Sequence, residues 1–240
     1  MLSRVELIND GIICIDKPYG MTSFGALAHI RYVLSRRFNV RRVKTGHAGT
    51  LDPLATGVLI ICTGKATKRI EELQGMTKEY TATLQLGATT ASYDREHTVN
   101  ATYPTVHITE ALVRSTLGKF IGDIEQVPPG YSACKVNGKP AYMLMRKGRG
   151  VALKPKKLRV EEIELTAFDR DSMRASIRVV CGKGTYIRAL ARDIGTALGS
   201  GAFLRSLRRT RVGNVRVEDC VTLDDFPEWL DAHAGDVAGA

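Results

Sequence analysis

No stretch of the 240-residue sequence is apolar for long enough to cross a bilayer. The longest strongly apolar run, Val58-Leu59-Ile60-Ile61-Cys62, is far shorter than the roughly 20 residues that a membrane-spanning helix needs. Residues 1–16 do not resemble a signal peptide, because Glu6, Asp10 and Asp16 interrupt them and no small-residue cleavage site follows. We therefore expect a cytoplasmic protein without a membrane anchor.

The cysteines are few and scattered, which argues against two kinds of stabilising site. There are five, and neighbouring ones lie at least 39 residues apart, with no Cys-x-x-Cys and no nearby pair of histidines. This spacing excludes a disulfide framework and a zinc site and predicts reduced thiols. No metal is expected.

Sequence motifs for several common chemistries are also missing. There is no Gly-x-Ser-x-Gly, no His-Glu-x-x-His and no Gly-x-Gly-x-x-Gly. Two segments, Gly64-Lys65-Ala66-Thr67 and Gly182-Lys183-Gly184-Thr185, resemble part of a phosphate loop, but neither has Ser or Thr directly after Gly-Lys. Nucleotide hydrolysis, zinc proteolysis and dinucleotide binding therefore have no support, and we expect no cofactor.

Positive charge is in excess and unevenly spread. Lysine and arginine outnumber aspartate and glutamate by 35 to 25, a formal net charge of +10. The bases gather in residues 31–44 and 126–160, which hold no acid, and in a cluster at 205–211, whereas the last 24 residues hold acids and no Lys or Arg. Basic segments without acids favour a polyanionic partner, most plausibly nucleic acid.

The hydrophobic periodicity predicts a mixture of strands and helices. Residues 11–15 read as a buried strand, and Thr22-Ser23 caps a helix carrying Phe24, Leu27, Ile30 and Leu34. Residues 80–86 and 173–180 alternate as half-buried strands, and helices are expected after Thr109 and after the turn at 182–185. Alternating strands with one polar face indicate an α+β protein with antiparallel strands and helices packed on one side.

One segment, residues 46–57, is dense in turn-forming residues and holds a single carboxylate. It contains three glycines and Pro53, and it lies between a basic run and the apolar strand that follows. Pro53 restricts the backbone of Asp52 to the extended region, which fixes where the carboxylate points. A purely structural Asp-Pro turn explains the segment equally well at this stage.

The same segment, Gly46-His47-Ala48-Gly49-Thr50-Leu51-Asp52-Pro53-Leu54-Ala55-Thr56-Gly57, closely resembles the active-site motif of the bacterial tRNA pseudouridine-55 synthases, the TruB family. Four further motifs match in order, at residues 16–23, 78–80, 128–133 and 182–188. The resemblance spans residues from about 11 to about 213. It implies the pseudouridine synthase fold, a mixed and largely antiparallel sheet with helices packed on it and a catalytic cleft across the sheet.

The resemblance also implies a reaction and a set of site residues. The family isomerises uridine 55 in the tRNA T-loop to pseudouridine, without a cofactor, after extruding the base from the loop. Asp52 matches the catalytic aspartate, and Arg188 the arginine that keeps it ionised. Tyr80 matches the tyrosine that stacks on the uracil and helps proton transfer. The remaining matches are His47, the wedge inserted into the T-loop; Tyr186, beside the nucleophile; Leu207, lining the uracil pocket; and Lys17, supporting the active-site loop.

The end of the chain departs from many family members. They continue into a small C-terminal RNA-binding domain, whereas only an acidic stretch follows Arg216 here. We expect a catalytic domain at residues 1–216, a short acidic tail at 217–240 and no separate RNA-binding domain. The expected partner is the T-arm of tRNA, bound by a monomer without an obligatory protein partner.

Two other functions remain open at this stage. One is a non-catalytic RNA chaperone that opens and refolds tRNA with the same basic surface. The other is a pseudouridine synthase that acts on another RNA under the control of a guide or a partner, as in archaeal and eukaryotic relatives.

Overall fold

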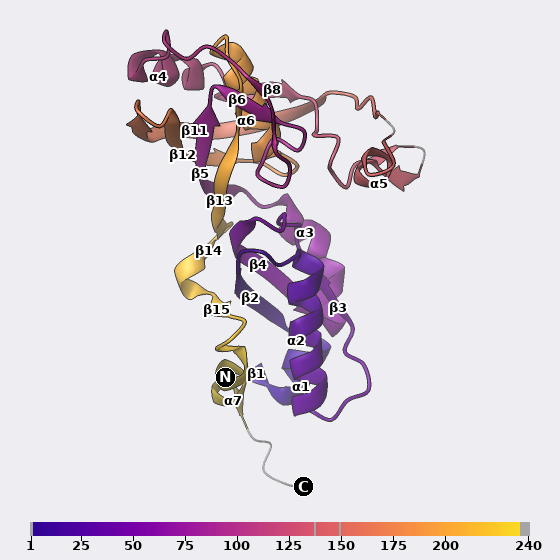
Figure 1. Cartoon of the computed structure of the whole chain (residues 1–240). Coiled ribbons are helices and arrows are strands. Elements are labelled where there is room, and N and C mark those ends of the chain that lie inside the picture. The colour runs from indigo at the N-terminus through magenta and orange to yellow at the C-terminus, as the bar shows by residue number, and fades with distance from the viewer. Residues whose placement is uncertain (1, 137, 149, 236–240) are drawn as a thin grey trace, which may run out of the picture. The chain divides into compact units, whose positions relative to one another are not determined.

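The structure is a computed structural model that describes residues 2–136, 138–148 and 150–235. The chain divides into two compact units: unit 1 comprises residues 1–78 and 208–240, and unit 2 comprises residues 79–207. Strand β13 (Ala202–Val212) contributes residues to both. Both units combine helices with strands that pair largely antiparallel, so the α+β class is confirmed (Figure 1).

Unit 1 is built from the two ends of the chain. Its elements before residue 78 are β1 (Leu2–Ser3), α1 (Arg4–Asn9), β2 (Ile12–Lys17), α2 (Ser23–Arg37), β3 (Thr45–His47), β4 (Ala55–Thr63), the 3-10 helix η1 (Gly64–Arg69) and α3 (Ile70–Gly75). Its elements after β13 are β14 (Val215–Arg216), the 3-10 helix η2 (Val217–Asp219), β15 (Val221–Thr222), α7 (Phe226–His233) and β16 (Ala234–Gly235). The sheet order is β15-β2-β4-β13, with β3 on β4. Strand β2 pairs antiparallel with β4, and β15 runs parallel to β2.

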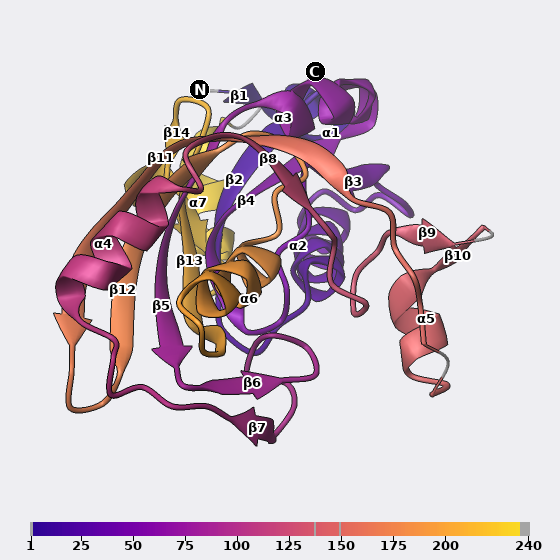
Figure 2. The same cartoon turned by 90° about the horizontal axis from the view of Figure 1, so that it is seen from above.

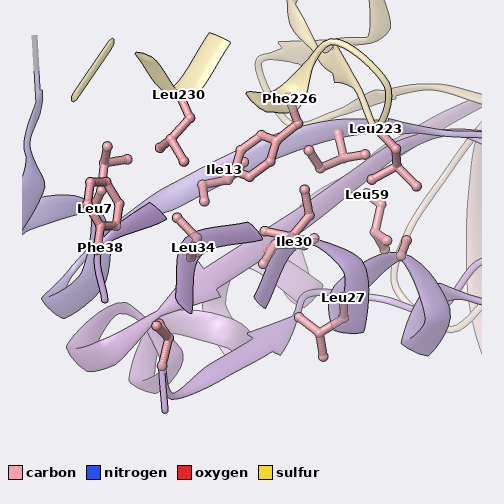
Figure 3. Close-up of a cluster of buried hydrophobic side chains, with 14 residues drawn as sticks. Leu7, Ile13, Leu27, Ile30, Leu34, Phe38, Leu59, Leu223, Phe226 and Leu230 are labelled. Carbon is pink, nitrogen blue, oxygen red and sulfur yellow. The ribbon is translucent and has the colours of Figure 1, made fainter. Parts of the chain in front are cut away.

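The central strand of unit 1, β4, is buried on both faces. Leu59 and Ile61 pack into a core shared with α2, β2 and α7 (Figure 3). Val58 and Ile60 point the other way, into a second cluster that includes Ala48. Because both faces of β4 are covered, its sequence is a continuous apolar run. The loop that precedes β4 is thus joined at its C-terminal end to a buried strand.

The acidic stretch after Arg216 is folded over most of its length. Leu223, Phe226 and Leu230 are at most 5% exposed and belong to the same core as α2 (Figure 3). Arg37 at the end of α2 pairs with Asp231 of α7. The sequence-based boundary at residue 216 therefore does not separate a tail from the fold: residues 217–235 are part of unit 1, and residues 236–240 lie outside the described residues.

Unit 2 carries a second run of strands in the order β13-β5-β12-β11-β8. Its elements are β5 (Lys78–Leu86), β6 (Ala88–Thr90), β7 (Val99–Thr102), α4 (Glu110–Gly118), β8 (Gly122–Gln126), β9 (Lys135–Val136), β10 (Lys139–Pro140), α5 (Ala141–Met145), β11 (Lys156–Asp169), β12 (Arg174–Cys181) and α6 (Ile187–Ala197). Strand β11 pairs antiparallel with both β8 and β12. Helix α4 packs on β11, and β9, β10 and α5 project from the rest of the unit (Figure 2).

The alternation predicted for unit 2 is confirmed. In β5, Tyr80, Ala82, Leu84 and Leu86 are buried, whereas Thr81 is exposed. Thr109 caps α4, its hydroxyl accepting a hydrogen bond from the backbone N–H of Leu112.

None of the helices in the described ranges combines the length and the apolar character that crossing a membrane would require.

One detail of the predicted helix α2 is wrong. Leu27, Ile30 and Leu34 are buried as expected, but Phe24 is 65% exposed. At about 100° per residue, Phe24 lies outside the stripe that the three other residues define. Its aromatic ring therefore faces water instead of the core.

Candidate functional site

Asp52 lies in a loop of unit 1 that connects β3 to β4 and is fastened to the start of α2. The Ser23 hydroxyl donates to the Leu51 carbonyl at 2.9 Å and accepts from the Leu51 N–H at 2.8 Å. The Gly20 N–H donates to the Pro53 carbonyl at 2.9 Å. Both neighbours of Asp52 are thus held by buried or backbone groups, which fixes the position of the carboxylate.

Lys17, at the end of β2, also binds this loop. Its side chain is fully buried, and its ammonium donates to the carbonyls of Pro18 at 2.7 Å, Met21 at 2.6 Å and Pro53 at 3.4 Å. Burial lowers the pKa of Lys17 to about 8, against the opposing effect of the Asp52 charge, which favours the ammonium form. Lys17 is therefore mostly charged at neutral pH and links residues 17–21 to the loop.

A second buried base, Arg209, contacts the other side of the loop. It is 2% exposed, and its guanidinium donates to the carbonyls of Val58 at 2.8 Å and Gly49 at 3.1 Å. At Gly57, with a φ of 105°, a Cβ would lie 2.1 Å from the Arg209 carbonyl oxygen. Only glycine fits there, so the glycines of the segment allow the chain to pass close to β13.

The basic cluster at residues 205–211 is therefore only partly exposed. Arg209 is internal, and Arg208 forms a two-pronged ion pair with Asp16, with N–O distances of 2.7 and 3.1 Å. The Arg208 guanidinium also donates to the Thr56 hydroxyl at 3.2 Å. Arg209 is therefore used inside unit 1, whereas Arg208 contacts the loop at Thr56 and keeps part of its side chain exposed.

His47, the residue before this loop, is half-buried at the end of β3. Burial, and secondarily the charge of Arg209, lowers its pKa below the usual histidine value. The lowered pKa favours the uncharged form of the ring at neutral pH.

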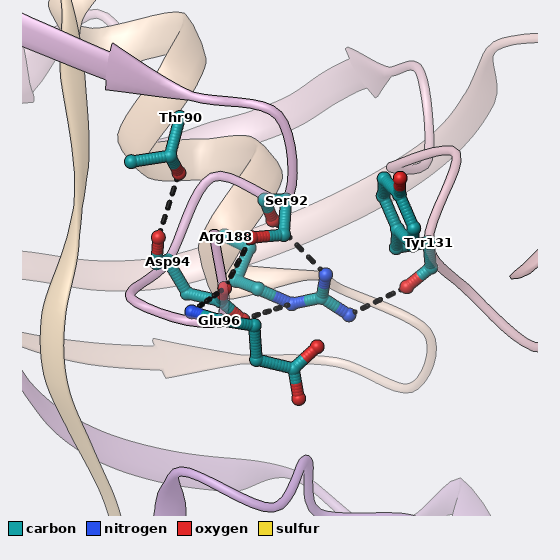
Figure 4. Close-up of polar contacts among 6 residues, drawn as sticks. All are labelled: Thr90, Ser92, Asp94, Glu96, Tyr131 and Arg188. Carbon is teal, nitrogen blue, oxygen red and sulfur yellow. Dashed lines mark hydrogen bonds and ion pairs between the residues drawn. The ribbon is translucent and has the colours of Figure 1, made fainter. Parts of the chain in front are cut away.

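Arg188 is a buried side chain of unit 2 with several polar partners. It lies in the first turn of α6 and is 4% exposed. Its guanidinium donates to the carbonyls of Ser92 at 3.1 Å and Tyr131 at 2.9 Å, and its Nε lies 3.6 Å from a carboxylate oxygen of Asp94 (Figure 4). A buried arginine with this many partners has a fixed orientation.

No sequence motif singles out Asp94, the ion-pair partner of Arg188. It is 5% exposed and accepts hydrogen bonds from the Ser92 hydroxyl and from the Glu96 N–H (Figure 4). Its partner Arg188 is distant in sequence, so no local pattern marked the pair. Within unit 2, Asp94 balances the charge of Arg188 and holds its Nε side.

Tyr186 and Tyr80 also lie in unit 2. The backbone of Tyr186 is bracketed by the buried Gln126 amide, whose Oε1 accepts from the Tyr186 N–H at 2.9 Å and whose Nε2 donates to its carbonyl at 3.2 Å. Tyr80 is 8% exposed on β5, and Leu207 is half-buried on β13. Gln126 was missed by sequence reasoning for the same reason as Asp94.

The predicted site residues are thus distributed over both units. Lys17, His47 and Asp52 belong to unit 1, and Tyr80, Tyr186, Arg188 and Leu207 belong to unit 2. Among the described residues there is no group of three or more His, Cys, Asp and Glu side chains able to hold a metal ion.

The charge state of Lys17 gives a pH-dependent stability. Its pKa in the folded protein, about 8, is below that of a free lysine, so the unfolded chain binds more protons between about pH 8 and 10.5. The cost of burying the charge is present below that window and disappears through it. We expect the unfolding free energy of wild type minus that of Lys17→Met to grow by about 1–3 kcal/mol from pH 7 to 10. Urea unfolding of both proteins measures it, and a constant difference would contradict the account.

Cys134 differs from Cys14, Cys62 and Cys220 in that its pKa is lowered, whereas theirs are raised. Burial raises its pKa, but hydrogen bonding to Tyr186 and Ser132 and the charge of Lys156 outweigh burial, so the net shift is downward. Burial raises the pKa of Cys14 to about 11 and that of Cys220 to about 12. We expect iodoacetamide at pH 7.5 to alkylate Cys134 before these two, by peptide mass mapping, and Lys156→Gln to slow it. Equal rates at the three thiols would refute this assignment.

Comparison with known proteins matches nearly the whole chain. Residues 36–187 match the family described as TruB family pseudouridylate synthase (N terminal domain), and residues 188–237 match the tRNA pseudouridylate synthase B C-terminal domain. The second match includes the folded residues after Arg216.

Several curated relatives are similar over most of their length. The chain is 62% identical to the tRNA pseudouridine synthase B of Phocaeicola vulgatus over 220 residues, 92% of this chain and 93% of that protein. It is 45% identical to the protein of the same name from Flavobacterium johnsoniae, over 94% of this chain and 98% of that one.

Solved structures agree with the fold. A Cbf5-Nop10-Gar1 complex contains a chain with a TM-score of 0.70 and 29% identity, matched by 96% of this chain; the match spans only 58% of that longer chain. An archaeal box H/ACA sRNP Nop10-Cbf5 complex gives a TM-score of 0.66 at 30% identity, with 94% of this chain and 55% of that chain covered. With both family models and these relatives in agreement, the chain belongs to the TruB family of pseudouridylate synthases.

Proposed function

We propose that the protein converts uridine 55 in the T-loop of tRNA to pseudouridine. The observation that carries the proposal is the loop around its single carboxylate, Asp52: Lys17, Ser23 and Arg209 hold this loop by hydrogen bonds to the carbonyls of Pro53, Leu51 and Gly49. The relatives named tRNA pseudouridine synthase B support the substrate.

The reaction is an isomerisation in which no atom is gained or lost overall. The C1'–N1 bond of the uridine breaks, the base turns, and a C1'–C5 bond forms. The hydrogen on C5 leaves as a proton, and N1 takes up a proton from solvent or from an acid. Asp52 acts in this scheme as a nucleophile or as a base at the sugar, and either role needs the ionised carboxylate.

We assign the other residues supporting roles in the same reaction. Arg188, held in place by Asp94, is assigned the role of counter-ion to the Asp52 carboxylate. Tyr80 stacks on the extruded uracil and assists proton transfer, while Tyr186 and Leu207 line its pocket. His47, whose lowered pKa keeps it neutral, fills the space that the base leaves in the T-loop.

Lys17 has a role in holding the catalytic loop. Its ammonium joins the Pro53 carbonyl to residues 18–21, so it positions Asp52 without touching the substrate. We further propose that the protein acts as a monomer in the cytoplasm, without a guide RNA or a protein partner.

Position mapping on an unmodified tRNA transcript tests the proposal. Purified protein is incubated with the transcript alone, treated with a carbodiimide that marks pseudouridine, and read by primer extension. We expect one stop, at position 55, and none in a transcript with cytidine there. A stop elsewhere would point to another RNA site. Modification only after adding cell extract would indicate a required partner, and refolding of tRNA without any stop would indicate a chaperone.

A further inference from the structure

Helix α2 begins beside the loop that holds Asp52. The backbone bond between Gly20 and Pro53 and the two bonds between Ser23 and Leu51 join the segment preceding α2, and its first residue, to that loop. The helix then runs along β2 and β4 of unit 1 (Figure 1). An RNA with its target base at Asp52 must pass close to the start of this helix.

The outer face of α2 is unusually aromatic for a solvated helix. Phe24 is 65% exposed and Tyr32 is 62% exposed, and Tyr19, just before the helix, is 59% exposed. They are among the most exposed large apolar side chains of unit 1, and folding does not use their rings. Exposed aromatic rings that follow a single helix are suited to stacking on unpaired bases.

The same face carries unbalanced positive charge. No acid stands between Asp16 and Asp52 in the sequence. Within the described ranges, Arg31 and Arg36 form no ion pair with any carboxylate, whereas the neighbouring Arg37 is paired with Asp231. At about 100° per residue, both arginines lie, like Phe24 and Tyr32, outside the buried stripe of α2.

An acidic border limits this surface on one flank. The cavity of about 420 Å³ beside His29 of α2 is lined by Asp224 and Asp225 as well as by Asp16 and Lys17. Asp16 is neutralised by its ion pair with Arg208, so the negative charge of this flank comes from Asp224 and Asp225, which disfavour a phosphate backbone there.

We propose that Tyr19, Phe24, Arg31, Tyr32 and Arg36, here called the α2 track, bind the substrate tRNA outside the catalytic loop. The guanidinium groups contact phosphates, and at least one ring stacks on an unpaired base. The proposal rests on the proposed function for the identity of the RNA. A protein partner would find few hydrophobic neighbours around these isolated rings, whereas charge and π-faces together match RNA.

Salt dependence tests the charged half of the track. The double variant Arg31→Ala/Arg36→Ala and the control Arg37→Ala are titrated with a full tRNA transcript at several salt concentrations. We expect the double variant to flatten the slope of log affinity against log salt by about 1.5–2 and to lose affinity by about tenfold, and the control to change the slope by less than half as much. A double variant with the slope of wild type would overturn the proposal.

Stacking is tested by removing the rings while keeping apolar side chains. We expect Phe24→Leu/Tyr32→Leu to weaken tRNA binding by about tenfold, and Tyr32→Phe to bind like wild type because it keeps the ring. Circular dichroism and the elution volume verify fold and mass. Unchanged binding by the leucine variant would refute the stacking role. Unchanged binding together with an altered mass would show that the surface joins two copies of the chain instead.

Single-turnover conversion at saturating tRNA separates this inference from the proposed function. We expect the α2 track variants to reach the wild-type rate once saturated, since none of these residues contacts the reacting uridine in our account. If wild type binds tRNA but makes no pseudouridine, the proposed function fails while the binding data still test the track. If wild type makes pseudouridine and the variants bind normally, only the track fails.

Discussion

Asp52→Asn is expected to lose at least about 10⁴-fold in the rate of pseudouridine formation while binding tRNA about as tightly as wild type. The substitution keeps the size and planarity of the side chain but removes its charge, so the amide can neither attack carbon nor accept a proton. The loop itself should persist, because its anchors at Leu51 and Pro53 are backbone groups. Binding is measured by filter retention and the rate by single-turnover mapping.

A matched control removes a carboxylate elsewhere in unit 1. Asp219 is exposed in the 3-10 helix η2, and Asp219→Asn makes the same chemical change away from the loop. We expect its rate to stay within about twofold of wild type. If both variants lost activity equally, the loss would reflect charge or folding and not the position of Asp52.

Arg209→Met is expected to be the most damaging change that does not touch the substrate. It leaves the carbonyls of Val58 and Gly49 without their guanidinium donor inside unit 1. Each unsatisfied buried carbonyl costs about 1–3 kcal/mol, partly offset because a charge is no longer buried, so we expect a loss of about 2–4 kcal/mol in unfolding free energy. Because the Asp52 loop loses one anchor, the single-turnover rate should also fall by about 100-fold.

The effect of the Arg209 charge on the pKa of His47 tests where Arg209 lies, independently of how much Arg209→Met lowers the unfolding free energy. Its charge lowers the pKa of His47 and opposes the charged form of Lys17. Arg209→Met should therefore raise the pKa of His47, as followed by NMR titration below the unfolding temperature. Arg216→Met, on the exposed side of β14, is the control and should change neither quantity. A His47 pKa unchanged in Arg209→Met would contradict the geometry described for this side chain.

Local patterns predicted the elements of the fold well. The burial of Tyr80, Ala82, Leu84 and Leu86 follows from alternation alone, because a strand that packs one face repeats every two residues. The caps at Thr22 and Thr109 were equally readable, since both side chains accept bonds from the first helical turn.

Contacts between segments that are distant in sequence were harder to predict. The acid-rich stretch after Arg216 looked like a tail because charge dominates its composition, although Leu223, Phe226 and Leu230 repeat at the three- and four-residue spacing of a buried face. The bases of residues 205–211 were predicted to form a single surface that binds a polyanion. Arg209 is buried instead, and its guanidinium donates to a backbone carbonyl of a loop that is distant in sequence.

Only those site residues that lie in a family motif could be predicted from the sequence. Asp52 and Arg188 came from family motifs, whereas Asp94 and Gln126, which hold Arg188 and Tyr186 in place, carry no local signature. A buried ion pair between residues far apart in sequence leaves no periodic trace, so such partners become visible only when the chain is folded.

Tritium release from a T-arm minihelix labelled at C5 of the single uridine at position 55 measures directly whether the protein is an Asp52-dependent isomerase. Wild-type protein, without cofactor, guide or partner, should release one tritium per RNA, and Asp52→Asn under the same conditions should release none while retaining the RNA on a filter. Release by Asp52→Asn at the wild-type rate, or no release by wild type that binds the minihelix, would contradict an Asp52-dependent uridine isomerase.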